Sequence, residues 1–201
     1  MPFEEDSTDG RVRFELGNGA TLYADTGAFS QGQYATIHDA VLVHNDGTSR
    51  EVVVKVLRLS TPAHARMETA IHRLACRCQL PENTKGHRAG GHRAGAPMLY
   101  ETFMWNPTHT AVVMEKMHGN LYHLLGDTSN ACRRAKLAKR AMKHVSRFLK
   151  VMQAKHQFMH RDLHGSNVLY KLEQGYYCAN GAPVSKFTFY VADFGNACTK
   201  R

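Results

Sequence analysis

The chain has 201 residues and carries 26 Lys and Arg against 17 Asp and Glu, a formal net charge of +9 with a pI near 9.5. This charge favours anionic partners such as nucleotide phosphates, acidic protein segments or nucleic acid, and a solvated basic surface is the alternative. No nucleic-acid-binding motif is present. No stretch approaches the roughly 20 apolar residues of a membrane helix, so we expect no membrane contact.

The cysteines and the N-terminus predict the compartment. Five cysteines are an odd number and do not form a compact disulfide framework. The N-terminal residues are acidic and lack the apolar core of a secretory signal. We therefore expect reduced thiols in an intracellular, cytoplasmic protein, with the nucleus left open.

The first half of the chain is rich in predicted strands. Residues 1–19 form a polar N-terminal segment, and residues 20–58 have a strand-like pattern. Two β-branched runs, residues 40–44 and 51–57, flank Asn45-Asp46-Gly47-Thr48. Asp-Gly between such runs is a strong hairpin signal.

A helix and an insertion follow the hairpin. Pro62 suits the first turn of a helix that apolar spacing extends to about Cys78. Residues 81–96 include a directly repeated Gly-His-Arg-Ala-Gly unit and are predicted to form a flexible surface insertion. Two further strands are predicted at residues 98–104 and 110–114.

The longest helix is predicted over residues 131–155, after several N-cap candidates. Lys and Arg crowd its first half. A strand pair is predicted at residues 168–170 and 187–192, around a turn with Asn180-Gly181. The apolar residues of the long helix recur at intervals of three and four and are expected to face the core: Ala138, Ala141, Met142, Val145, Phe148, Leu149 and Met152.

Two short motifs near the end of the chain carry most of the functional information. His160-Arg161-Asp162 precedes Asn167 by five residues, and Asp193-Phe194-Gly195 follows the second apolar run. This order supplies an Asp that can accept a hydroxyl proton and two oxygen ligands for the metal ions of a nucleotide. On these motifs the chain resembles a protein kinase, of the kind that acts on Ser and Thr, with features of large-DNA-virus kinases.

The resemblance implies an α+β, kinase-like fold. A β-rich N-lobe with one helix would span residues 20–117 and contain the insertion. A hinge and a partial, mainly helical C-lobe would span residues 118–201. The chain stops six residues after Gly195, so we expect a truncated C-lobe covered by a partner protein or a protein substrate.

The resemblance also implies ATP and Mg²⁺ as cofactors and assigns roles to individual residues. Asp162 would be the catalytic base, Asn167 and Asp193 would bind the metal, and His160 would be a structural brace. Lys55, in a V-A-I-K-like strand, would contact the phosphates and pair with Glu68. The remaining ATP-binding candidates lie in a degraded glycine loop and in the hinge: Ser30, Gly32, Ala35, Ile37, Met114, Glu115, Met117 and Asn120.

These residues predict an ATP-dependent phosphotransferase that transfers the γ-phosphate to a protein Ser or Thr hydroxyl. Two alternatives remain open. A pseudokinase-like regulatory module would bind nucleotide with little or no transfer, which the weak glycine loop would favour. A small-molecule phosphotransferase of the aminoglycoside type is suggested by His164, which stands where protein kinases carry Lys.

Overall fold

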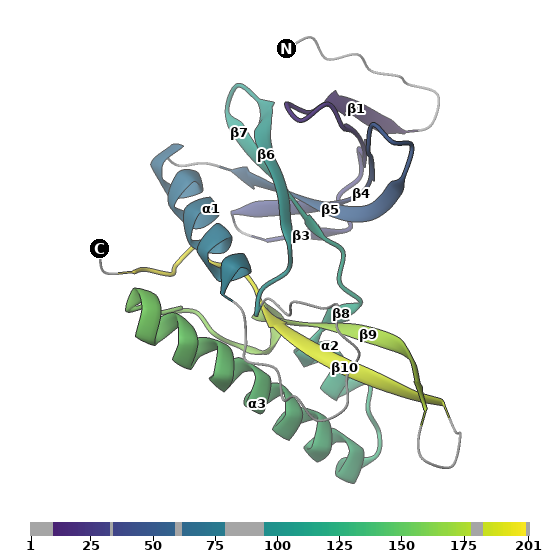
Figure 1. The fold of residues 1–201 in the computed structure, drawn as a ribbon, viewed down its shortest axis with the longest axis vertical. Helices are drawn as coiled ribbons and strands as arrows, with labels where there is room; N and C mark the ends of the chain where they lie inside the picture. The colour runs from purple at the N-terminus through teal and green to yellow at the C-terminus, as the bar shows by residue number, and fades with distance from the viewer. Residues whose placement is uncertain (1–9, 33, 59–61, 79–94, 178–182, 200–201) are drawn as a thin grey trace. The chain divides into compact units, whose positions relative to one another are not determined.

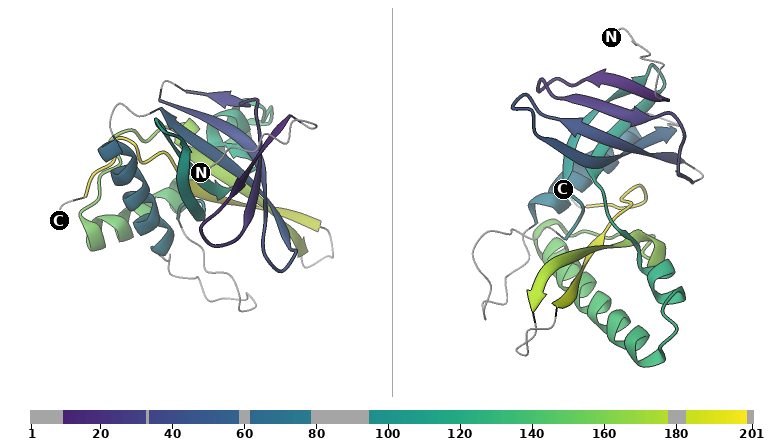
Figure 2. Two further views of the ribbon diagram at one scale, coloured as in Figure 1. Left: turned by 90° about the horizontal axis from the view of Figure 1, so that it is seen from above. Right: turned by 90° about the vertical axis from the view of Figure 1, so that its right-hand side faces the viewer.

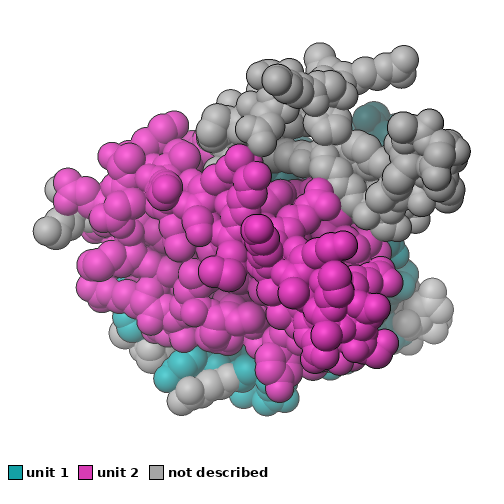
Figure 3. Space-filling model, turned by 90° about the horizontal axis from the view of Figure 1, so that it is seen from below, with its two compact units in different colours: residues 1–69, 98–116 teal, residues 70–97, 117–201 magenta. Residues whose placement is uncertain are grey.

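The computed structural model describes residues 10–32, 34–58, 62–78, 95–177 and 183–199. The chain is a mixed α and β protein with antiparallel sheets and few helices (Figure 1), and Figure 2 shows the same elements from two further sides. Among the described residues, no helix is both long and apolar enough to cross a bilayer. The chain divides into two compact units, coloured separately in Figure 3: unit 1 has residues 1–69 and 98–116, and unit 2 has residues 70–97 and 117–201.

Unit 1 is built on a curled, antiparallel sheet of seven strands in the order β1-β2-β4-β5-β7-β6, with β3 paired to β4 (Figure 1). The strands are β1 (Arg11–Glu15), β2 (Thr21–Asp25), β3 (Ser30–Gln31), β4 (Ala35–Val43), β5 (Ser49–Arg58), β6 (Leu99–Asn106) and β7 (His109–Glu115).

The predicted β4–β5 hairpin is confirmed. Val43 pairs with Ser49 at its tip, and Gly47 has a φ of 80°, a conformation that glycine adopts without steric cost. Strand β1 was not predicted, because residues 1–19 read as a polar segment. Phe14 of β1 nevertheless packs against the buried core of the sheet, and Leu16, directly after β1, belongs to that core.

Side chains alternate between the two faces of strand β5, and each face packs against a different buried cluster. Val52, Val54 and Val56 face a core that includes most of the sheet's buried residues. The intervening residues point to the opposite face, where Leu57 joins a second cluster with Ala65 of helix α1 (Pro62–Arg77). Because the side-chain period is two, Lys55 lies on this helix-covered face.

Unit 2 contains the part of α1 from Ala70 onward, a three-stranded antiparallel sheet and two further α-helices. The sheet has the order β10-β9-β8. After α1, the elements of unit 2 in chain order are β8 (Gly119–Asn120), α2 (Leu121–Gly126), α3 (Ala131–His156), the 3-10 helix η1 (Gly165–Asn167), β9 (Val168–Tyr177) and β10 (Pro183–Val191). The short helix α2 was not predicted.

Helix α3 confirms the long predicted helix, and both of its ends are capped. Asn130 accepts a hydrogen bond from the Arg133 N–H at the start, and Gln157 adopts the left-handed conformation at the end. The predicted apolar stripe is wrong at Met142, whose side chain is 68% exposed. Leu137 is buried instead, because the core-facing residues of α3 are Leu137, Ala141, Phe148 and Met152.

The predicted insertion and the turn between β9 and β10 fall mainly outside the described residues, which omit 79–94 and 178–182. The end of the insertion is described and is buried. Gly95 accepts a hydrogen bond from the Val191 N–H at 2.8 Å, and Ala96 belongs to the core of unit 2. Residues 95 and 96 are therefore part of the packed interior, which the prediction of a flexible surface insertion over 81–96 did not anticipate.

Candidate functional site

In unit 1, Lys55 and Glu68 form a largely buried ion pair. Lys55 Nζ lies 2.6 Å from Glu68 Oε1, and the two side chains are 13% and 14% exposed. The alternation of β5 turns Lys55 toward α1, and Glu68 lies in the second turn of that helix. The carboxylate compensates the lysine charge in a site where an isolated ammonium would be costly. The contact expected from the sequence is therefore present.

The degraded glycine loop folds as a short hairpin in unit 1. Ser30 pairs with Ile37, and the Gly32 N–H donates to the Ala35 carbonyl at 2.8 Å. Gly32 does not adopt positive φ, and a Cβ there would meet only the Ala35 carbonyl oxygen at 3.7 Å. Nothing in the described hairpin therefore requires glycine at this position. Ala35 itself is buried in the second core of unit 1.

The four hinge candidates have different environments. Met114 is buried in the second core of unit 1, and the Glu115 N–H donates to the Met98 carbonyl at 2.8 Å. Met117 lies between β7 and β8, where the chain passes from unit 1 to unit 2. The Asn120 side chain accepts a hydrogen bond from the His123 N–H and so caps α2. The structure thus gives Asn120 a local structural role.

In unit 2, the loop from Asp162 to Asn167 is held together by its own side chains. Asn167 Nδ2 donates to the Asp162 backbone carbonyl at 2.9 Å and lies 3.1 Å from His164 Nε2. The Ser166 N–H donates to His164 Nδ1 at 3.3 Å, so the imidazole caps η1. The His164 ring is therefore engaged with its own loop, although its side chain is 54% exposed.

His160 connects this loop to the end of β10. Its Nε2 lies 2.9 Å from the Ala192 carbonyl, an acceptor, so Nε2 carries the proton. The ring is buried between Phe158 and Phe194. Burial lowers the pKa of His160 below its ordinary value, although the Ala192 hydrogen bond and nearby carboxylates act in the opposite direction. His160 is thus a neutral, packed group.

Asn167 and Asp193 are brought together through the backbone. The Ala192 N–H donates to the Asn167 carbonyl at 2.9 Å, and Asp193 is the next residue. Asp193 has a φ of 61° and Arg161 a φ of 65°, both in the left-handed region. Such conformations are costly for residues other than glycine, and they cluster at functional sites.

The donor set suits a hard cation. Among the described residues, no three His, Cys, Asp or Glu side chains form a metal-binding group. The amide nitrogen of Asn167 donates to the Asp162 carbonyl, and its Oδ1 forms no hydrogen bond with the described residues. Mg²⁺ is bound by a few amide and carboxylate oxygens, keeps several waters and shares its remaining ligands with phosphates. Asn167 and Asp193 supply one oxygen ligand of each type, so their chemistry fits Mg²⁺.

One residue of the site was not predicted from the sequence. Asn196 Nδ2 donates to Asp162 Oδ2 at 3.3 Å, and an isolated β-bridge between Met159 and Cys198 pairs the segment after Asp193 with the residues just before the 162–167 loop. Asn196 lies only three residues after Asp193, but no spacing rule used above marks it as a partner of Asp162.

Searches against models of protein families and against curated proteins found no match to this chain.

Proposed function

We propose that the chain is an ATP-dependent phosphotransferase with a kinase-type fold, transferring the γ-phosphate to a protein Ser or Thr hydroxyl. The observation that carries the proposal is the construction of the 162–167 loop. Its Asn167 amide nitrogen is fixed on the Asp162 carbonyl, and the backbone joins this loop to the residue before Asp193. Asn167 Oδ1 has no hydrogen-bond partner among the described residues and is not a buried unpaired atom, so water or a metal ion can reach it.

Each residue then has a proposed task. Asp162, half-exposed and restrained by Asn196, accepts the proton of the acceptor hydroxyl. The hydroxyl oxygen forms a bond to the γ-phosphorus as the bond from that phosphorus to the β–γ bridging oxygen breaks, which leaves ADP. Asn167 and Asp193 would hold Mg²⁺, which when bound neutralises phosphate charge. Lys55, fixed by Glu68, would bind the phosphates.

A nucleotide-binding regulatory module is the second candidate, and the β3–β4 hairpin favours it. The Gly32 N–H already donates a hydrogen bond to the Ala35 carbonyl, so it is not available as a donor to a phosphate. A loop that contributes few backbone donors would bind ATP weakly and support little transfer.

One experiment separates these candidates. Thermal unfolding is measured with and without ATP and Mg²⁺, beside phosphoryl transfer from ATP to dephosphorylated casein or to kanamycin, for wild type and Asp162→Asn. The proposal expects ATP to stabilise both proteins, and casein phosphorylation to fall at least about a hundredfold in the variant. Stabilisation without Asp162-dependent transfer identifies the regulatory module, transfer to kanamycin alone identifies a small-molecule enzyme, and no effect of ATP rejects both nucleotide functions.

A further inference from the structure

Charge is distributed very unevenly between the two units. Unit 2 contains 19 Lys and Arg against 5 Asp and Glu, a net charge of +14, whereas unit 1 contains 7 against 12, a net charge of −5. Helix α3 concentrates this excess, because its 26 residues include nine Lys and Arg and no Asp or Glu. The basic character of the chain is therefore a property of unit 2, and of α3 in particular.

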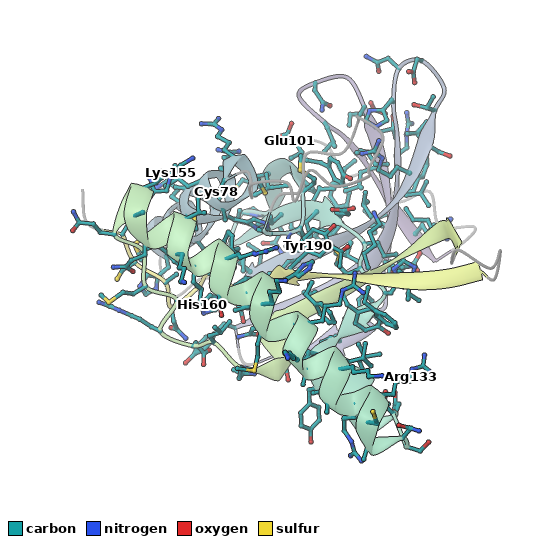
Figure 4. The ribbon with its side chains drawn as sticks, turned by 60° about the horizontal axis from the view of Figure 1, so that its bottom comes forward. Cys78, Glu101, Arg133, Lys155, His160 and Tyr190 are labelled. Atoms are coloured by element: carbon teal, nitrogen blue, oxygen red, sulfur yellow. The ribbon has the colours of Figure 1, made fainter. Side chains whose placement is uncertain are left out.

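Six of the nine cations form a single row along α3, at successive spacings of three, four, three, four and three residues. The cation row consists of Arg133, Lys136, Arg140, Lys143, Arg147 and Lys150. At 100° per residue these positions fall within a sector of roughly 100°, and at 1.5 Å per residue the row is about 25 Å long. Arg133 and Lys155 are labelled near the two ends of the helix in Figure 4.

The cation row is not neutralised by its own unit. Four of its side chains are exposed, Arg140 and Arg147 are half-buried, and none forms an ion pair with a described carboxylate. The core-facing residues of α3 lie on a different side of the helix. The row therefore presents its charges to whatever lies outside unit 2 on that side of α3.

A helix face that only contacts solvent is expected to carry charges of both signs. Cations three and four residues apart repel one another, and acidic residues interleaved among them would convert that repulsion into attraction. Arg133 and Lys136 also lie near the positive end of the helix dipole, where acidic residues are favourable and cations are not. The first turn of α3 contains no acidic residue. The arrangement opposes the stability of the helix, which points to a function for the row.

We propose that the cation row binds the phosphate backbone of a double-stranded nucleic acid without reading its sequence. A duplex carries about one negative charge per 1.7 Å of its axis, so a stretch as long as the row presents about 15 phosphates. The row contains no aromatic side chain on which single-stranded bases could stack. It also lacks the apolar anchors of a protein interface, because the exposed Met142 is not part of it. This binding is independent of phosphoryl transfer.

The test measures binding of a fluorescein-labelled 20-base-pair DNA duplex of random sequence by anisotropy at 50, 100 and 200 mM NaCl. The row variant is Lys136→Gln with Lys143→Gln and Lys150→Gln, all at exposed positions. The control variant, Arg77→Gln with Arg134→Gln and Lys155→Gln, removes the same net charge from exposed positions of unit 2 outside the row.

Wild type should bind with a slope of log affinity against log salt of roughly −5, from six phosphate contacts at about 0.9 each. The row variant should lose about 2.7 of that slope and bind at least about tenfold more weakly at 100 mM NaCl, whereas the control variant should stay within about twofold of wild type. Equal weakening in both variants, or none in either, overturns the proposal.

Two further measurements complete the test. If a single strand of equal length, a poly-glutamate peptide or anionic lipid vesicles bind more tightly than the duplex and lose binding in the row variant, the row serves that ligand and the proposal is wrong. Without nucleic acid, the row variant should melt at the same temperature as wild type or higher, because repulsion within α3 is removed. A lower melting temperature would show instead that the lysines stabilise the fold.

Discussion

The side-chain amide of Asn167 is held by the backbone of Asp162, through a hydrogen bond of 2.9 Å from Nδ2 to the carbonyl oxygen. This contact connects the two ends of a loop that carries both the proposed base and a proposed metal ligand. It also decides which atom of the amide is free, because a carbonyl oxygen can be satisfied only by the nitrogen. The orientation of Oδ1 is therefore a consequence of local hydrogen bonding.

Replacing Asn167 by Asp tests this relationship. The new carboxylate oxygen would face the Asp162 carbonyl with no proton between them, and we expect the free energy of unfolding to fall by about 1–3 kcal/mol. Urea denaturation measures the change. Asn130→Asp is the matched control, because an Asp caps a helix as well as Asn does and should leave stability within about 0.5 kcal/mol of wild type. Equal effects in the two variants would contradict the assigned contact.

The Lys55–Glu68 pair predicts strong non-additivity. Lys55→Met or Glu68→Met leaves a largely buried charge without its partner, and each should cost about 3 kcal/mol. The double variant should recover most of this loss, because two apolar side chains can pack where the ions were. Chemical denaturation of all four proteins gives the coupling energy. The exposed Arg11–Asp25 pair, treated in the same way, should show a coupling below about 1 kcal/mol.

Two substitutions of His164 should differ in their effect on the rate of the proposed phosphoryl transfer. Its ring accepts from the Ser166 N–H as a cap of η1. Asn is a good capping residue, so His164→Asn should keep phosphoryl transfer within about tenfold of wild type, whereas His164→Ala should lose more. The dependence of the rate on Mg²⁺ concentration should shift with His164→Ala, since the ring also adjoins the Asn167 amide. Equal losses in both variants would assign the imidazole a direct chemical role.

The buried His160 predicts acid sensitivity. Because its pKa is lowered in the folded protein by burial, the unfolded chain binds the proton first as the pH falls. The contribution of His160 to stability is therefore complete above its ordinary pKa of 6.5 and is lost as the pH falls from there to the folded-state pKa. Urea denaturation between pH 8 and pH 5 should show a shallower loss for His160→Asn than for wild type. Parallel pH profiles would refute this assignment.

Gly95 predicts a severe packing defect. A Cβ at this position would lie 2.0 Å from Cδ2 of Phe148, which is 1% exposed. Gly95→Ala should lower the free energy of unfolding by about 3 kcal/mol, since neither the ring nor the backbone can move freely in a packed core. Adding Phe148→Leu should restore part of the loss. Gly17→Ala, where a Cβ would meet nothing within 4 Å, should be nearly neutral by the same measurement.

Local patterns were the part of the fold that could be predicted from the sequence. The β4–β5 hairpin, helix α1 and helix α3 each have their own turn residues, caps or periodicity, and all three are confirmed. Helix α2 has only six residues, too few for a periodic signal. Met142 was placed in the core because three- and four-residue spacing defines a stripe without fixing which edge of it faces inward.

Contacts between distant residues could not be predicted in this way. Gly95 and Phe148 are 53 positions apart. No local sequence pattern predicts that the Gly95 backbone approaches the Phe148 ring. The same holds for Asn196 and Asp162. The motif around Asp162 predicts a set of candidate site residues, but the hydrogen bonds among them are not encoded by a spacing pattern.

The two ends of the stretch between Cys78 and Gly95 are fixed to one interior, since Cys78 and Ala96 belong to the same buried cluster. Cys78 and Gly95 are 17 positions apart in the sequence. For a chain segment that joins two fixed points, each doubling of its length costs only about 0.6 kcal/mol of closure entropy. Because the interior of unit 2 holds both points, we expect its packing to tolerate a change in the number of residues that connect them.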